Sequence, residues 1–332
     1  MNAPFQLGRF AFNKPVILAP MSGVSDLPFR DIAHAMGASL VVSEMVASEP
    51  LVRLRRDMLR KAVRPAHAPF VIQLAGREAH WMAEGAKVAA DMGADIVDIN
   101  MGCPARVVTG GLSGSALMRE PDHALSLIEA TVRAVGVPVT LKMRMGWDHG
   151  SLNAPELAVR AEAAGVRMIT VHGRTRCQFF KGKADWSFVR KVKAAVKIPV
   201  IVNGDIEGLG DAVASLAASG ADGLMIGRAA YGQPWLPGRA ARYLATGKDP
   251  GDPSPDDWAA LIRGHFEAML IHYGRELGLK NMRKHFGSYV TRLLGDRPLG
   301  KAWRRRLCES DDVEFVRASL GELFLAHVGA AA

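Results

Sequence analysis

The chain has 332 residues, of which 49% are hydrophobic and 23% are charged, and this is ample for a large core and ordinary for a soluble protein. Its formal net charge of +9 favours an anionic partner, of which nucleic acid is one example. Its three cysteines form no C-x-x-C pair, and no signal peptide or membrane-length apolar run is visible. A disulfide framework, a cysteine-bound metal, secretion and membrane insertion are therefore not expected, and the simplest location is the cytoplasm.

Eight short apolar runs in the first two thirds of the chain predict strands. They cover residues 15–21, 40–43, 70–74, 96–100, 137–142, 168–172, 199–203 and 223–226. Ala-rich amphipathic stretches between them, such as 81–92, 123–134 and 155–164, predict helices. Gly93, Gly165 and Gly220 follow helical stretches, as is typical of helix C-terminal caps.

Strands at intervals of about 25 to 45 residues, each followed by a helix, match a (β/α)8 barrel of roughly 250 residues. A doubly wound open sheet is the main alternative. That fold normally has fewer strands and often carries a G-x-G-x-x-G turn, which follows none of the predicted strands. We therefore predict an α/β chain with a TIM barrel.

The pattern changes after about residue 243. Residues 246–255 are rich in Pro, Gly and Asp, as in a linker, and no strand pattern follows them. The stretches 258–273, 280–294, 300–308 and 312–328 predict helices. The expected organisation is a barrel domain over residues 1–243 and a small all-helical bundle over 244–332.

Cys103 is the first candidate for a reacting side chain. It lies between Gly102 and Pro104, directly after the buried strand that ends at Asn100. Loops at the carboxyl ends of parallel strands carry the chemistry of α/β proteins. Cys177 and Cys308 have no comparable setting.

Polar and mostly cationic residues occupy the other predicted strand ends. They are Pro20, Met21, Ser22, Ser43, Glu44, Gln73, Asn100, Lys142, Arg144, His172, Arg174, Asn203, Gly204, Asp205, Gly227 and Arg228. In many barrels the loops after strands seven and eight bind phosphate through backbone N–H groups. Gly204 and Gly227 could each be only a tight turn, but as a pair, with Arg228, they favour a phosphate site.

Other rim residues suit a planar heterocycle. Lys142 ends an apolar strand and needs an anionic or polar partner, unless it extends to solvent. Gln73 could hydrogen-bond a ring or cap its strand, and Met21 could pack beneath the ring or fill the core. His172 could contact a phosphate, a base edge or a proton in transit, or be structural.

Together these motifs resemble the tRNA-dihydrouridine synthases, and most closely their bacterial B-type branch. The resemblance covers nearly the whole chain and rests on residues 19–21, 98–104, 141–144, 172–176, 203–205 and 226–228. It implies a flavoenzyme barrel with a helical tRNA-binding domain. Such an enzyme reduces the C5–C6 bond of particular tRNA uridines with FMN, which NADPH reduces again.

The resemblance also implies roles for individual residues. FMN would be held by Pro20, Met21, Ser22, Gln73, Lys142, His172, Asn203, Gly204, Asp205, Gly227 and Arg228. Substrate contacts are expected from Asn100, Arg144, Arg174, Arg283 and Lys284. Cys103 would donate the proton to C5 of the uracil while hydride reaches C6 from the flavin, since free thiols are largely protonated at neutral pH.

A uridine in folded tRNA must be turned out of its stack before it can enter the barrel mouth. The tRNA must therefore be bound on a basic surface beside the mouth. One basic cluster lies within residues 53–64. A second runs through the bundle from Lys280 to Arg306, and we expect only Asp296 to oppose it. We expect the cationic face of helix 280–294 to contact phosphates, although a solvated helix face is the usual alternative.

Two other functions fit parts of the pattern. A barrel flavoenzyme that reduces a free small molecule, such as a dihydropyrimidine or dihydroorotate dehydrogenase, would not need the basic bundle. An RNA-binding or regulatory protein would not need the full set of rim residues. We therefore expect a metal-free, monomeric enzyme whose partners are tRNA and NAD(P)H.

Overall fold

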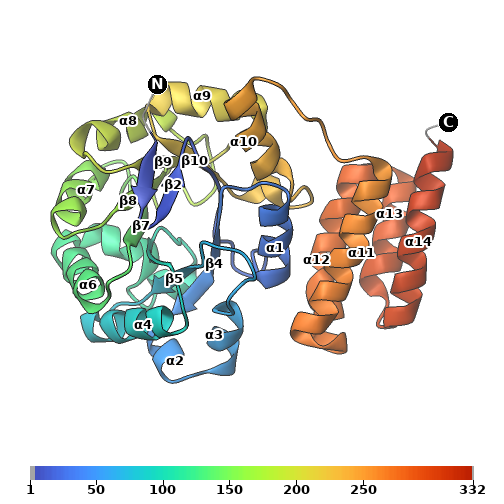
Figure 1. Cartoon of the computed structure of the whole chain (residues 1–332), viewed down its shortest axis with the longest axis horizontal. Coiled ribbons are helices and arrows are strands. Elements are labelled where there is room, and N and C mark those ends of the chain that lie inside the picture. The colour runs from blue at the N-terminus through green and yellow to red at the C-terminus, as the bar shows by residue number, and fades with distance from the viewer. Residues whose placement is uncertain (1–3, 331–332) are drawn as a thin grey trace.

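Eight parallel strands close into a barrel, with their connecting helices outside it (Figure 1). The computed structural model describes residues 4–330. The strands are β3 (Val16–Leu18), β4 (Leu40–Ala47), β5 (Val71–Ala75), β6 (Ile96–Met101), β7 (Val139–Arg144), β8 (Met168–His172), β9 (Val200–Asn203) and β10 (Gly223–Ile226). Strand β10 pairs with β3 and closes the ring, so the predicted TIM barrel is confirmed.

A hairpin of two short strands, β1 (Phe5–Leu7) and β2 (Phe10–Phe12), precedes the barrel. Leu7 and Phe12 pack against Ile17, Leu40 and other residues that begin the barrel strands. The hairpin thus covers the amino-terminal end of the barrel, and it has no counterpart among the predicted elements. The carboxyl ends of the strands are left to form the mouth.

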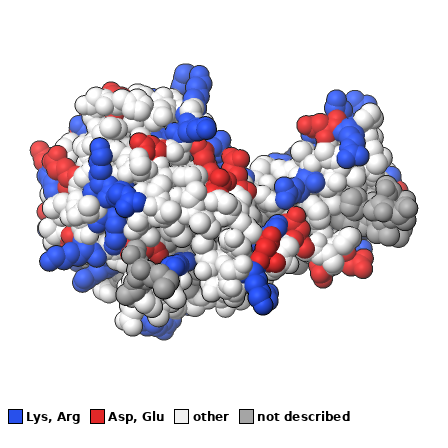
Figure 2. Space-filling view, turned by 90° about the horizontal axis from the view of Figure 1, so that it is seen from above, with Lys and Arg blue, Asp and Glu red and all other residues white. Residues whose placement is uncertain are grey.

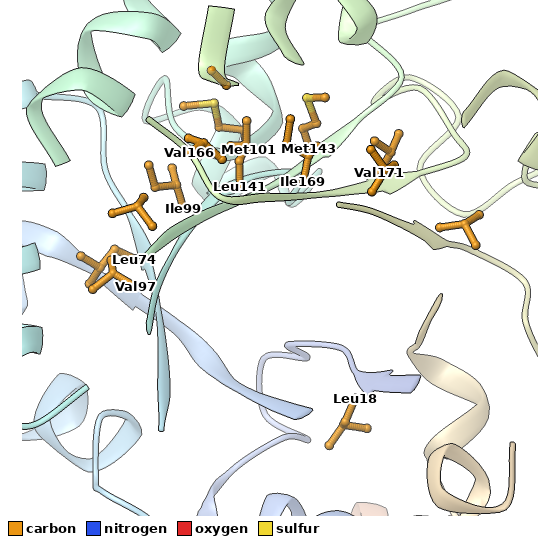
Figure 3. Packing of buried hydrophobic residues seen from close by; sticks show 14 of the residues in the cluster. Leu18, Leu74, Val97, Ile99, Met101, Leu141, Met143, Val166, Ile169 and Val171 are labelled. Atoms are coloured by element: carbon orange, nitrogen blue, oxygen red, sulfur yellow. The ribbon is translucent and has the colours of Figure 1, made fainter. Parts of the chain in front are cut away.

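The outer core lies between the strands and the surrounding helices. Figure 3 shows Met101, Leu141, Met143 and Ile169 pointing to one side of the sheet, toward the helices. Because the strands are buried on both faces, they read as continuous apolar runs in the sequence. The helices are α1 (Leu27–Ala35), α2 (Ser48–Val52), α3 (Arg56–Lys61), α4 (Ala79–Asp91), α5 (Arg106–Thr109), η1 (Gly114–Arg119), α6 (Pro121–Ala134), α7 (Ala154–Ala163), α8 (Trp186–Ala195), α9 (Leu209–Ser219), η2 (Arg228–Ala230) and α10 (Leu236–Thr246).

Four further helices form the bundle, α11 (Pro255–Tyr273), α12 (Arg275–Leu294), α13 (Pro298–Glu309) and α14 (Val313–Ala330). They surround a hydrophobic cluster of their own, which includes Phe266, Phe286 and Trp303. Helix α12 begins five residues before the predicted start at residue 280. Gly278 explains the difference, since its missing side chain lets this first turn lie against the Met269 carbonyl, 2.6 Å from where a Cβ would be.

The bundle packs beside helix α1 of the barrel, as Figure 1 shows. Phe29 of α1 lies against two buried histidines of the bundle, with ring centroids 5.9 Å from His265 and 5.4 Å from His285. The Tyr273 hydroxyl donates to the Asp26 carboxylate at 3.1 Å. Over residues 4–330, no helix has the length and apolar character needed to cross a membrane.

Candidate active site at the barrel mouth

A cavity of about 510 Å³ opens at the carboxyl ends of the strands. Its walls contain most of the residues predicted from the strand ends. They are Pro20, Met21, Ser22, Gln73, Asn100, Cys103, Lys142, Arg144, His172, Asn203, Gly204, Asp205, Gly227 and Arg228. Residues spread over more than 200 positions are therefore brought to one chamber, because parallel barrel strands all end at the same rim.

Cys103 follows β6 on a loop whose backbone is held from two sides. The Asn100 side chain accepts from the Cys103 backbone N–H at 3.0 Å and from that of Gly102 at 3.1 Å. The Ser115 hydroxyl and backbone N–H donate to the Cys103 carbonyl at 2.8 and 3.1 Å. The half-buried thiol therefore projects into the cavity from a fixed backbone.

Lys142 brings a buried ammonium group to the same cavity. Its Nζ donates to Asn203 Oδ1 at 3.1 Å, and the Asn203 amide is oriented by its bond to the Met225 carbonyl at 2.8 Å. Burial, together with the nearby charge of Arg144, lowers the pKa of Lys142 from 10.5 to about 8, although Asp98 acts in the opposite direction. An anionic ligand in the cavity would relieve this strain on the charged form.

His172 is held as a neutral imidazole. Burial lowers its pKa well below 6.5, and the charges of Arg144 and Lys142 act in the same direction. Its Nε2 lies 3.3 Å from the guanidinium of Arg174. Because a guanidinium only donates, Nε2 is the acceptor and Nδ1 carries the hydrogen.

The loops after β9 and β10 form the cationic end of the cavity. Gly204 has φ of +113°, and a Cβ there would lie 2.8 Å from His172 Cδ2, so this turn requires glycine. The side chain of Arg228 is 59% exposed. Its guanidinium lies 3.3 Å from the Asp205 carboxylate and 4.9 Å from the centre of the Phe180 ring. Its charge is thus available to a ligand.

Two predicted substrate residues, Arg144 and Arg174, are hydrogen-bonded to the loops of the rim. Arg174 is 2% exposed and does not line the cavity, because its guanidinium binds Asp205 and the carbonyls of Lys181 and Gly182. Arg144 lines the cavity, but its Nε and Nη1 donate to the carbonyls of Gly102, Thr175 and Phe179 at 2.8, 2.8 and 2.9 Å. Both arginines fix the loops of the rim, and Arg144 also faces the cavity.

A second hollow of about 780 Å³ lies between the rim and the bundle. Its walls include Lys284 and Arg292 of α12 and Arg304 of α13. Four residues, Glu207, Arg228, Ala229 and Tyr231, line both this groove and the cavity. Lys284 reaches the barrel, where its Nζ lies 3.4 Å from the position a Cβ on Gly23 would take. Part of the second predicted basic cluster thus lines this groove, whereas no residue of the cluster within 53–64 does.

Arg283 differs from its neighbour Lys284. It donates to the Asp311 carboxylate at 2.5 Å and to the Ser310 carbonyl at 2.9 Å, and it does not line the groove.

The expectation that Asp296 alone opposes the basic bundle is wrong. Acidic residues of the linker and of other parts of the bundle also pair with its arginines; these are Asp252, Glu309, Asp311 and Glu322. Figure 2 shows both signs of charge on one face of the molecule, whose outline narrows where barrel and bundle meet.

Several residues at the site were not predicted. Asp98 and Thr140 lie below the cavity and connect Gln73 to the neighbouring strands. Phe179 and Phe180 line the mouth. Asp98 belongs to the same motif as Cys103, and an acidic residue inside an apolar strand is the signal that could have identified it. Among the residues whose side chains the structure describes, which end at residue 323, no group of three or more His, Cys, Asp or Glu is arranged to hold a metal ion.

Comparison with known proteins identifies the family. Residues 17–324 match the model of the family described as "Dihydrouridine synthase (Dus)". The chain belongs to the dihydrouridine synthase family. It is 55% identical over 286 residues to a protein named "Probable tRNA-dihydrouridine synthase" from Rhodobacter capsulatus, covering 86% of this chain and 88% of the relative. It is 41% identical over 320 residues to "tRNA-dihydrouridine synthase B" of Pseudomonas putida, with 96% and 94% covered. The predicted family and its bacterial B-type branch are confirmed.

Solved structures support the fold. A morphinone reductase mutant in complex with tetrahydroNAD has a TM-score of 0.52 and 16% sequence identity, covering 76% of this chain and 92% of that one. Histamine dehydrogenase from Rhizobium sp. 4-9 has a TM-score of 0.54 and 14% identity, with 80% and 50% covered. At these identities the likeness concerns the barrel architecture alone.

Proposed function

We propose that this chain is a flavin-dependent oxidoreductase that reduces the C5–C6 double bond of particular tRNA uridines to 5,6-dihydrouridine. The observation that carries the proposal is the position of Cys103, which faces a cavity with Lys142 and Gln73 on its wall and a basic groove beside it. Membership of the dihydrouridine synthase family supports the same function. The groove favours a polynucleotide over a free small molecule.

The residues of the cavity fit FMN. The Lys142 ammonium has three N–H groups and one hydrogen bond to Asn203, which leaves donors for the electron-rich ring. Gln73 can offer one N–H and one lone pair beyond the bonds it makes inside the protein. The phosphate would lie at the backbone of Gly204 and Gly227 near Arg228. The complete proposed FMN set is Pro20, Met21, Ser22, Gln73, Lys142, His172, Asn203, Gly204, Asp205, Gly227 and Arg228.

FMN, when bound and reduced by NADPH, would supply a hydride to C6 of the uracil. Cys103 then donates the proton of its Sγ to C5, so that the base gains one hydride and one proton. The resulting thiolate regains its proton from solvent. Asn100 holds the Cys103 backbone through this step, and neutral His172 provides a hydrogen-bonding group without adding positive charge to the site.

We assign residues 1–243 to catalysis and residues 244–332 to tRNA binding. The phosphates beside the uridine would lie in the groove, against Lys284, Arg292 and Arg304, while the turned-out base enters the cavity. Because the groove and the cavity share four lining residues, they would act as two parts of one binding site. We further propose that the enzyme acts on tRNA as a monomer in the cytoplasm.

The purified protein tests the proposal directly. It should be yellow and release FMN on denaturation. With NADPH and tRNA that lacks modifications, it should form dihydrouridine, detected by mass spectrometry of the digested tRNA. A colourless protein that cannot be reconstituted with FMN would overturn the proposal.

A further inference from the structure

Three buried polar side chains lie in a row on adjacent strands of the barrel, below the cavity. Gln73, Asp98 and Thr140 are register partners on β5, β6 and β7. Their side chains are 0%, 4% and 2% exposed. Gln73 Nε2 donates to Asp98 Oδ2 at 2.7 Å, and the Thr140 hydroxyl donates to Asp98 Oδ1 at 2.6 Å. The carboxylate therefore joins the two neighbouring strands without lining the cavity itself.

The row continues upward to Cys103 through Asn100. Asn100 Nδ2 donates to Gln73 Oε1 at 2.7 Å, while Asn100 Oδ1 accepts from the backbone N–H groups of Gly102 and Cys103. A backbone N–H can only donate, so the oxygen of Asn100 must face Cys103 and its nitrogen must face Gln73. Gln73 must then turn its oxygen to Asn100 and its nitrogen to Asp98. The direction of the whole chain of hydrogen bonds is fixed.

We propose that Asp98 is a positioning residue for the reaction, acting through Gln73 and Asn100. It keeps the Gln73 amide in the orientation that its cavity contacts require, and it keeps Asn100 bound to the Cys103 loop. The role of Asp98 in orienting Gln73 toward FMN rests on the proposed function. Its role in holding the Cys103 loop through Asn100 rests on the observed contacts alone.

A competing explanation treats Asp98 as the counter-charge of buried Lys142, since the carboxylate favours the charged lysine. Replacement by asparagine separates the two explanations. The carbonyl of the introduced amide can still accept from Gln73 Nε2, and its NH2 group can donate to the Thr140 hydroxyl oxygen. The hydrogen-bonded row survives Asp98→Asn, whereas the charge does not. Asp98→Leu removes both.

The experiment compares holoenzymes that carry Asp98→Asn, Asp98→Leu and the double change Asp98→Asn with Thr140→Val. The double variant keeps the side-chain volumes but removes the hydroxyl that orients the amide, so it remains informative if Asp98→Leu does not fold. Three readouts are used: the visible absorption spectrum of the FMN, the single-turnover rate of flavin oxidation by tRNA, and the rate at which iodoacetamide labels Cys103. Peptide mapping separates Cys103 from Cys177 and Cys308.

We expect Asp98→Asn to stay within about threefold of the natural protein in both rates. The double variant and Asp98→Leu should lose about tenfold or more in turnover, shift the flavin spectrum and label Cys103 several-fold faster, as expected for the loss of a buried hydrogen bond. Asparagine as damaging as leucine would overturn the proposal in favour of charge pairing, and a normal double variant would also overturn it. If the natural protein bound no FMN, the proposed function would fail, but the Cys103 labelling rates would still decide the role of Asp98.

Discussion

Replacement of Lys142 by methionine should have opposite effects on stability and on cofactor binding. Burial lowers the pKa of this lysine from 10.5 to about 8. At roughly 1.4 kcal/mol for each pKa unit, keeping the ammonium charged at pH 7 costs the folded protein about 3 kcal/mol. Methionine has a similar length and no charge. The flavin-free variant should therefore be more stable at pH 7, by up to about 3 kcal/mol.

The same energy predicts the loss of FMN binding. An anionic or electron-rich ligand that restores the ordinary pKa of Lys142 recovers up to about 3 kcal/mol, which corresponds to roughly a hundredfold in affinity. In the flavin-free natural protein, the contribution of Lys142 to the free energy of unfolding changes with pH in a definite direction. Between pH 8 and 10.5 the unfolded chain binds a proton at Lys142 that the folded chain has lost, so the contribution of this residue to stability rises with pH.

Urea denaturation of the flavin-free proteins at pH 7 and 9.5 measures the first effect, and fluorescence titration with FMN measures the second. Lys197→Met changes an exposed lysine of the α8–β9 turn and should alter neither. A Lys142→Met protein that is less stable than the natural one and still binds FMN normally would refute the reasoning.

Three further changes test other parts of the site. Cys103→Ala should keep FMN binding and NADPH oxidation but slow uridine reduction by about 10²- to 10⁴-fold, the usual contribution of a general acid; full activity would exclude this role. Lys284→Gln should weaken tRNA binding and lower the salt slope by about one. Arg283→Gln is its control, because Arg283 lies outside the groove, and equal effects of the two would contradict the assignment. Gly204→Ala should cost more stability than Gly247→Ala in thermal unfolding, since both have positive φ but only Gly204 is crowded; equal losses would show that crowding is unimportant there.

The barrel could be predicted because its signals are local. Each strand is a short apolar run, and glycines end the preceding helices. Gly93, Gly165 and Gly220 indeed have φ of +86°, +103° and +65°, the left-handed conformation of helix caps. The β1–β2 hairpin gives no comparable signal, since its strands have three residues each and their stability comes from packing on the barrel.

The location of the site could also be predicted, because residues at the carboxyl ends of barrel strands must meet. The roles of single charges could not. Arg174 and Arg228 both follow strands in the sequence, yet one is buried against Asp205 and the loop carbonyls and the other is exposed to the groove. Such partners come from other elements, so only the fold reveals which charges are already paired. Asp98 differs, because an acidic residue inside an apolar strand is a signal in the sequence, but its hydrogen-bond partners on the two neighbouring strands become visible only in the fold.

The cations around the mouth thus fall into two groups. Arg144 and Arg174 are satisfied by backbone carbonyls and by Asp205, and they hold the rim in shape. Lys142 and Arg228 have few protein partners and face the cavity. Burial lowers the pKa of His172 and keeps it neutral, and the charges of both groups act in the same direction. Lys142 and Arg228 are therefore the main source of attraction for an anionic ligand. A site of this kind is costly when empty, and the cost explains why removal of Lys142 should stabilise the flavin-free protein while weakening its affinity for the cofactor.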